Sequence, residues 1–326
     1  MPIFRKHRLT SLPLLLIVTF IFFSGVVLPV RAQQSNDYHL YGKVTDTRGN
    51  PIPGAVITLR EKNGWKEIKI VTDKNGRYDR WFIPHNIYEI KVEKEGYITK
   101  KGLWNLSRYE DQPIEKEINI VLVSEKEMQE YELGKKIKKN YEEAFKALQN
   151  NDCKKAMKKA NEVIKDAPDF FGGYFILGRC EIQAGHVNEA IQYYQKALSI
   201  KNDIPEAHLD LGNLYAQKQD LDAALREYQK VLELKPDHVD ALYSIGAIYY
   251  NRKEWDKAIE NLKKVVDLDP KHVQALRVLG YACAQKGDFK LAADFFKRYL
   301  ELNPDAKDRK AAEDIIKVAE SMNSSG

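Results

Sequence analysis

Cysteine is scarce in this chain of 326 residues: there are three, and none lies in or directly after the apolar run near the N-terminus. The pattern of a lipid-anchored lipoprotein is therefore missing. Blocks of one charge are missing too, because 52 basic and 47 acidic residues are mixed along the sequence. Even the lysine-rich stretch 135–159 contains Glu142, Glu143 and Asp152. Without clustered cations that displace counterions, no nucleic-acid partner is expected.

Catalytic motifs are also missing. The sequence has no H-E-x-x-H, no G-x-S-x-G and no phosphate-binding loop. His186 and Glu189 have an H-x-x-E spacing that zinc hydrolases use, but no third ligand or catalytic acid accompanies them. We therefore expect a non-enzymatic protein with no metal and no other cofactor.

Residues 1–32 have the pattern of a secretory signal peptide. Arg5, Lys6 and Arg8 precede an apolar run from Leu12 to Val30, and Ala32 is a small residue where a signal peptidase cleaves. An uncleaved membrane anchor is the alternative, because the run approaches the roughly 20 residues that span a bilayer. Since the positive charge precedes the run, both alternatives place the rest of the chain outside the cytoplasm. The expected location is secreted or periplasmic, with a membrane contact only if residues 12–30 are retained.

Residues 37–123 have the pattern of an antiparallel β domain. Short runs rich in Val, Ile, Tyr and Thr alternate with turn residues. Strands are expected at 40–44, 55–59, 88–93 and 117–123, with alternate side chains facing a core. Several short strands of this kind predict a sandwich.

This segment resembles the carboxypeptidase regulatory-like family, whose fold is a seven-stranded, transthyretin-like β-sandwich. The resemblance lies in Gly42-Lys43-Val44-Thr45-Asp46, Gly49-Asn50-Pro51-Ile52-Pro53-Gly54-Ala55, Thr72-Asp73-Lys74-Asn75-Gly76-Arg77-Tyr78, Tyr88 and Gly96-Tyr97. Such domains are accessory modules of secreted enzymes, receptors and adhesins, so the resemblance implies no catalytic residues. Trp65, Trp81 and Trp104 either form a sugar-stacking or protein-docking surface or complete the small core.

From residue 137 onward a 34-residue period replaces the strand pattern. Three kinds of residue recur with this period: glycine at Gly178, Gly212, Gly246 and Gly280, alanine at Ala156, Ala190, Ala224, Ala258 and Ala292, and proline at Pro168, Pro236, Pro270 and Pro304. Small residues let two antiparallel helices approach closely, and proline ends the second helix. The turn within a hairpin suits Asn151, Gly185 and Gly287, and a cap of the second helix is expected at Asp152, Asp220 and Asp288.

These hairpins resemble the tetratricopeptide repeat, and the resemblance covers five repeats: 137–170, 171–204, 205–238, 239–272 and 273–306. A helical linker is expected at 124–136, a capping helix at 307–320 and a disordered tail at 321–326. The whole chain is therefore predicted to be an N-terminal all-β sandwich followed by an all-α solenoid of tetratricopeptide repeats.

In this family the first helix of each repeat lines a concave groove that accepts an extended peptide or a partner helix. The family's groove positions correspond here to Tyr141, Phe145, Phe175, Arg179, Asn213, Gln217, Tyr243, Tyr250, Asn251, Arg277 and Tyr281. Clamping of a partner's C-terminal carboxylate is not expected, because Asn213 has no suitable Lys and Arg companions. His238 and His272 fall in connecting loops and are expected to be solvated.

Two hypotheses about function follow. The leading one is an exported scaffold whose groove binds a protein or peptide partner. The alternative is a glycan-binding or cell-envelope accessory protein whose β-sandwich makes the recognition.

The cysteines support one further hypothesis. Cys153 and Cys180 are expected at the same end of the stack and can form a disulfide in an oxidising compartment. Cys283 replaces a tyrosine of other repeats and is expected to be an inert core residue.

Overall fold

A computed structural model describes residues 37–107 and 115–324. The chain divides into two compact units, residues 1–125 and 126–326. The predicted signal segment lies outside the described residues. Among the helices that are described, none is long and apolar enough to cross a membrane.

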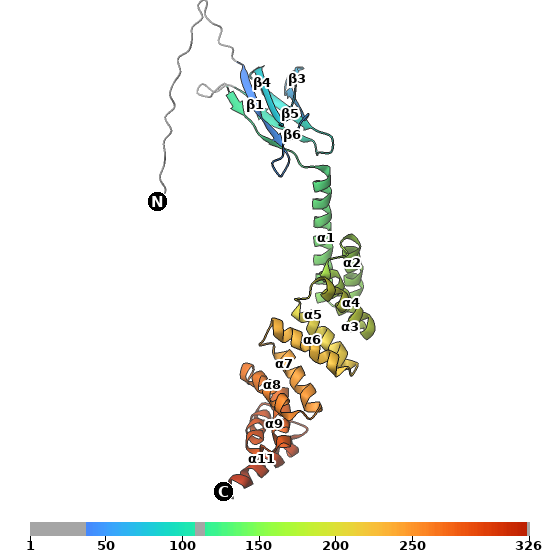
Figure 1. Cartoon of the computed structure of the whole chain (residues 1–326), viewed down its shortest axis with the longest axis vertical. Coiled ribbons are helices and arrows are strands. Elements are labelled where there is room, and N and C mark those ends of the chain that lie inside the picture. The colour runs from blue at the N-terminus through green and yellow to red at the C-terminus, as the bar shows by residue number, and fades with distance from the viewer. Residues whose placement is uncertain (1–36, 108–114, 325–326) are drawn as a thin grey trace, which may run out of the picture. The chain divides into compact units, whose positions relative to one another are not determined.

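The first unit is a sandwich of two sheets (Figure 1). In one sheet, β1 (Tyr38–Thr45) pairs antiparallel with β4 (Arg77–Ile83) on one side, and parallel with β7 (Glu115–Glu117) and β8 (Ile120–Val121) on the other. The other sheet is antiparallel, in the order β3 (Glu67–Val71), β2 (Val56–Glu61), β5 (Ile87–Glu93), β6 (Lys100–Asn105).

The described residues form eight strands rather than seven, because the run expected at 117–123 is interrupted. Between β7 and β8 the side-chain oxygen of Asn119 accepts the backbone N–H of Lys43 at 2.9 Å, a bond that a strand would make through its backbone. Gly42 lies beside this interruption, where a Cβ atom would collide with the carbonyl oxygen of Ile118. A glycine at this position therefore lets β1 and the final strands approach closely.

The core of the sandwich comes from the alternate residues that the strand pattern predicted. Leu40, Ile57, Leu59, Tyr88 and Val92 are fully buried. The buried phenol of Tyr88 donates a hydrogen bond to the carbonyl of Pro84 at 2.9 Å, so its burial leaves the hydroxyl with a partner.

The second unit is an array of helical hairpins. The helices are α1 (Glu125–Gln149), α2 (Cys153–Asp166), α3 (Phe171–Ala184), α4 (Val187–Ile200), α5 (Pro205–Gln217), α6 (Leu221–Leu234), α7 (Val239–Asn251), α8 (Trp255–Leu268), α9 (Val273–Lys286), α10 (Phe289–Leu302) and α11 (Arg309–Ser324). Two details differ from expectation. The linker at 124–136 is not a separate element, because α1 continues through it into the first repeat, and the final helix runs to Ser324 instead of ending at residue 320.

The glycine series explains how the two helices of a hairpin pack. Each of the four glycines faces one large side chain of the second helix, and these partners follow the same 34-residue period: Tyr194, Tyr228, Leu262 and Phe296. A Cβ atom on Gly212 would lie 2.6 Å from Cε1 of Tyr228, closer than real side chains approach. The large partner therefore occupies the space that the missing side chain leaves.

The turn inside each hairpin also repeats. Left-handed residues occur at Asn151, Gly185, Gln219, Lys253 and Gly287, with φ between 57° and 89°. The sequence indicated only the two glycines and the asparagine, because Gln and Lys rarely adopt this conformation.

The predicted caps are confirmed. The carboxylates of Asp152, Asp220 and Asp288 accept the backbone N–H three residues later at 3.0 to 3.1 Å. His238 and His272 lie in the connecting loops as expected, directly before α7 and α9, but they are half-buried rather than solvated. His272 accepts the N–H of Ala275 at 3.1 Å, and Nδ1 of His238 is buried.

Gly212→Ala is expected to lower the free energy of unfolding of the helical array by about 1–3 kcal/mol, because the added methyl overpacks against Tyr228. Urea denaturation followed by helical circular dichroism measures the change. Gly134→Ala is the matched control, since nothing lies within 4 Å of a Cβ atom there. The control should be neutral or stabilising by up to about 1 kcal/mol, and equal losses in both variants would contradict the packing argument.

Candidate partner-binding surface

All eleven residues of the predicted groove lie on the first helices of the five repeats. Tyr141 and Phe145 lie on α1, Phe175 and Arg179 on α3, Asn213 and Gln217 on α5, Tyr243, Tyr250 and Asn251 on α7, and Arg277 and Tyr281 on α9. We call the exposed side chains of α1, α3, α5, α7 and α9 the first-helix surface.

At the N-terminal end of this surface the predicted residues are aromatic. The rings of Tyr141 and Phe145 lie 6.3 Å apart, and Tyr141 also packs edge-on against Phe170 at 5.0 Å. Phe175 packs edge-on against Tyr194 at 5.7 Å. Phe145 is the exposed member of the group, so it offers an apolar contact while Tyr141 and Phe175 also support the hairpins.

Two of the predicted polar residues are engaged within the array. The guanidinium of Arg179 donates to Asp210 at 2.9 Å, and Tyr194 donates to the same carboxylate at 2.7 Å. The amide oxygen of Asn213 accepts from Tyr228 at 2.7 Å. These contacts connect neighbouring helices. The bonded guanidinium N–H of Arg179 and the side-chain oxygen of Asn213 are therefore already used within the array and are not available to a partner.

The same holds for Arg277 and Tyr281, which bind the carboxylate of Asp308. Arg277 Nε donates at 2.6 Å, Tyr281 at 3.0 Å, and Tyr299 of α10 reaches the other oxygen at 2.7 Å. Burial alone would raise the pKa of Asp308, but the hydrogen bonds from Tyr299, Arg277 and Tyr281 outweigh it and lower the pKa from 3.8 to about 2. Burial and the nearby Asp308 raise the pKa of Tyr281 to about 12. Because Asp308 directly precedes α11, this network fixes the final helix to the array.

Family models match both parts of the chain. A model described as TPR repeat matches residues 178–219 and 212–253, and a model described as tetratricopeptide repeat matches 249–307. A carboxypeptidase regulatory-like domain model matches 39–114. The chain carries a carboxypeptidase regulatory-like domain and tetratricopeptide repeats. The predicted fold class is thereby confirmed.

Solved structures resemble about half of the chain. A MamA protein has 26% identity over 54% of this chain and 96% of its own, with a TM-score of 0.48. MamA from Desulfovibrio magneticus RS-1 has 23% identity over 54% of this chain and 99% of its own, and its TM-score is also 0.48. YrrB, described as a TPR protein with an unusual peptide-binding site, has 20% identity over 52% of this chain and 88% of its own, and its TM-score is 0.48. Comparison with curated proteins gave no match.

The tetratricopeptide repeats share a feature that sequence reasoning found only in part. In every repeat the thirteenth residue is a carboxamide, and all of them are exposed: Gln149, Gln183, Gln217, Asn251 and Gln285. Gln183 accepts from the thiol of Cys153 at 2.8 Å, whereas the side chains of the other four make no hydrogen bond within the described part of the chain. We call this series the carboxamide ladder. Only Gln217 and Asn251 were predicted, and comparing exposed positions at the 34-residue period would have found the rest.

In the carboxypeptidase regulatory-like domain, the three tryptophans have different environments. Trp104 packs against the core, as one of the two interpretations expected. Trp65 and Trp81 do not complete the core, because they are 97% and 51% exposed.

The cysteines are free thiols in the structure. The sulfur of Cys180 lies 3.9 Å from the carbonyl oxygen of Cys153, so the two residues are neighbours, and their disulfide stays a prediction. Cys283 is fully buried, and burial raises the pKa of its thiol to about 11.

The H-x-x-E spacing is not used as a pair. His186 bonds Glu181 at 2.7 Å instead of Glu189. No cluster of three metal-ligating side chains occurs within residues 37–107 and 115–324.

Asp308→Asn is expected to destabilise the tetratricopeptide array by about 1–2 kcal/mol at pH 7, because three donors lose a charged acceptor. The folded-state pKa of Asp308 lies below its ordinary value, so its contribution is present above about pH 4 and is lost as the pH falls toward 2. Urea unfolding between pH 7 and 2 should therefore show the difference between wild type and variant shrinking with acid. Asp305→Asn in the same loop is the control. A difference in unfolding free energy between wild type and Asp308→Asn that does not change with pH would contradict the stabilising role of the Asp308 carboxylate.

Proposed function

We propose that the chain is an exported, non-enzymatic scaffold whose tetratricopeptide array binds an extended segment of a protein partner. The observation that carries the proposal is the carboxamide ladder, which places one uncharged exposed amide on each of five consecutive first helices. The same helices carry the residues that correspond to the family's groove positions, so the ladder and the predicted groove belong to one surface.

The chemistry of the ladder suits a peptide backbone. A carboxamide has one acceptor oxygen and a donor NH₂, which are the groups that a peptide unit needs opposite it. The ladder presents one such amide per repeat, so an extended segment that follows the first helices would meet them in succession. Backbone contacts of this kind would depend little on the partner's sequence. Phe145, Tyr243 and Tyr250 would add apolar contacts.

The internal contacts decide which residues test the proposal. Arg277→Ala would also release Asp308, and Asn213→Ala would remove the partner of Tyr228. Gln217, Asn251 and Gln285 have no such structural role among the described contacts. Replacing these three amides removes binding groups and leaves the hairpins intact.

The variant Gln217→Ala, Asn251→Ala, Gln285→Ala is expected to lose captured partners, because each hydrogen bond contributes about 0.5–1.5 kcal/mol. Affinity capture with the full chain from envelope extract, followed by mass spectrometry, identifies the partners. For a partner segment found in this way, titration should show a loss of at least about tenfold in affinity.

The control replaces three exposed amides of second helices, Asn161→Ala, Gln192→Ala and Gln229→Ala. It should capture the same proteins as the wild type. If the ladder variant also keeps them, the first-helix surface is not the binding site.

Export is a separate part of the proposal and rests on residues 1–32. Deleting them should leave the protein in the cytoplasm, whereas the full chain should reach a compartment accessible to external protease. Cell fractionation with immunoblotting measures this. Identical distribution of the two forms would refute export through this segment.

A further inference from the structure

We infer that the outer face of the sheet formed by β1, β4 and β7 binds a neutral polysaccharide, with Trp81 and Phe82 as its stacking platform. This site lies in the carboxypeptidase regulatory-like domain, and it is independent of the scaffold function proposed for the repeats.

The platform begins with a β-bulge between β1 and β4. Tyr38 pairs with Ile83 and Leu40 with Arg80, so Trp81 and Phe82 together stand opposite His39. Phe82 has a φ of 61°, which is rare for a bulky side chain and costs about 1–3 kcal/mol. Burial does not compensate for this strain, because Phe82 is 69% exposed. A strained aromatic residue held in solvent is more consistent with a binding role than with a packing role.

The orientation of Trp81 is fixed by His39. The two rings are stacked, with centroids 3.5 Å apart and an angle of 6° between their planes. His39 is only 9% exposed, and its Nε2 is hydrogen-bonded to Asp79 at 3.0 Å, while a carboxylate oxygen of Glu115 lies 3.5 Å from Nδ1. One face of the indole is therefore covered, while the residue remains half exposed. Because the ring is already oriented, a ligand that stacks on it meets a small entropic cost.

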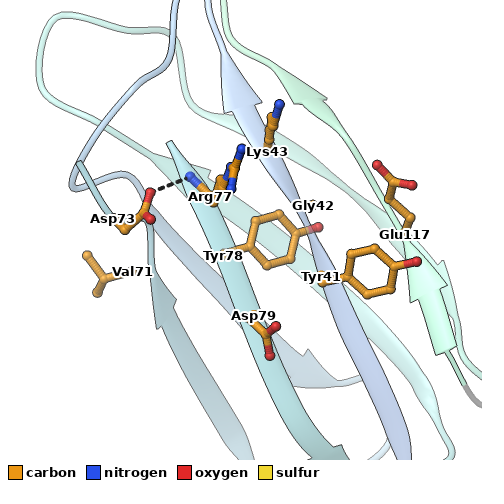
Figure 2. Close-up of a pocket in the computed structure, with 9 residues that line it drawn as sticks. All are labelled: Tyr41, Gly42, Lys43, Val71, Asp73, Arg77, Tyr78, Asp79 and Glu117. Atoms are coloured by element: carbon orange, nitrogen blue, oxygen red, sulfur yellow. Dashed lines mark hydrogen bonds between the residues drawn. The ribbon is translucent and has the colours of Figure 1, made fainter. Parts of the chain in front are cut away.

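Polar groups surround the platform. A shallow pocket of about 510 Å³ lies beside it, and Figure 2 shows Tyr41, Lys43, Arg77, Asp79 and Glu117 projecting from neighbouring strands. Lys43 and Arg77 are direct cross-strand partners, an arrangement of like charges that usually destabilises a sheet. Neither cation has an ion pair among the described residues, so both can donate to a ligand.

The mixture of charges argues for a neutral occupant. Three carboxylates, Asp73, Asp79 and Glu117, line the pocket with the two cations. Asp73 accepts the N–H groups of Asn75 and Arg77, whereas Asp79 and Glu117 each use one oxygen, toward His39 and Asn119, and keep the other as an acceptor. A polyanion would meet the carboxylates, and a polycation would meet Lys43 and Arg77. A pyranose has an apolar face that can stack on an indole and hydroxyl groups that both donate and accept. A pyranose can therefore stack on Trp81 and form hydrogen bonds with both the cations and the carboxylates of the pocket.

The test is affinity electrophoresis of the purified exported chain in gels containing hydroxyethylcellulose, glucomannan or laminarin, with polygalacturonate and polylysine as charged comparisons. At least one neutral polysaccharide should retard the wild type. Trp81→Ala should lose at least about tenfold in affinity, the equivalent of about 1.4 kcal/mol. Trp65→Ala is the control, because this exposed residue precedes β3 in the other sheet, and it should bind like the wild type.

Phe82→Gly separates binding from folding. Glycine accepts a positive φ, so the melting temperature should stay unchanged or rise while affinity for the polysaccharide falls. The proposal is overturned if no neutral polysaccharide retards the wild type, if only a charged polymer does, or if Trp81→Ala and Phe82→Gly bind normally. None of these results would affect the scaffold proposal, which depends on the other unit.

Discussion

The helical array depends on one contact, the close approach of a glycine in each first helix to a large side chain in the second. The contact is made four times at the same period, by Tyr194, Tyr228, Leu262 and Phe296 against glycines of the 34-residue series. It fixes the distance between the two helices, and the buried alanines of the second helix fit the same interval. Everything that the first helices present to solvent follows from this spacing, because it determines where successive exposed positions lie.

Adjacent hairpins are then held by polar contacts at their ends. Lys218 donates to Asn188, Arg252 to Asp222, and Lys286 pairs with Asp256. In each case a residue that follows the exposed carboxamide position reaches the second helix of the preceding repeat. These surface contacts are individually weak, but they repeat with the packing contact. The carboxamide is therefore left exposed while the next residue along the chain is used for contact between repeats.

Much of this organisation could be predicted from residues that have a single physical role: Gly246 marks close helix packing and Asp220 marks a helix cap. Residues that can have several roles were harder to predict from the sequence. Arg277 was predicted to face a partner, yet Asp308 binds it within the array, because only the folded chain brings these two charges together. Trp81 was the hardest to place. It continues the outward-facing alternation of Arg77 and Asp79, but no sequence pattern predicts the bulge that sets Trp81 and Phe82 together opposite His39.

The four strained non-glycine residues of the described chain show how strain can be interpreted. Asn151, Gln219 and Lys253 occupy the left-handed turn of a hairpin, where the packing of two helices on either side holds the backbone in that conformation. Their strain is a consequence of the repeat and needs no functional explanation. Phe82 lies in the bulge between β1 and β4, which accounts for a positive φ at this position but not for a phenylalanine: the side chain is in solvent, and a glycine would remove the strain. Replacing Phe82 with glycine would relieve the strain and remove only the aromatic ring. The ring itself is therefore the best explanation for a phenylalanine at this position.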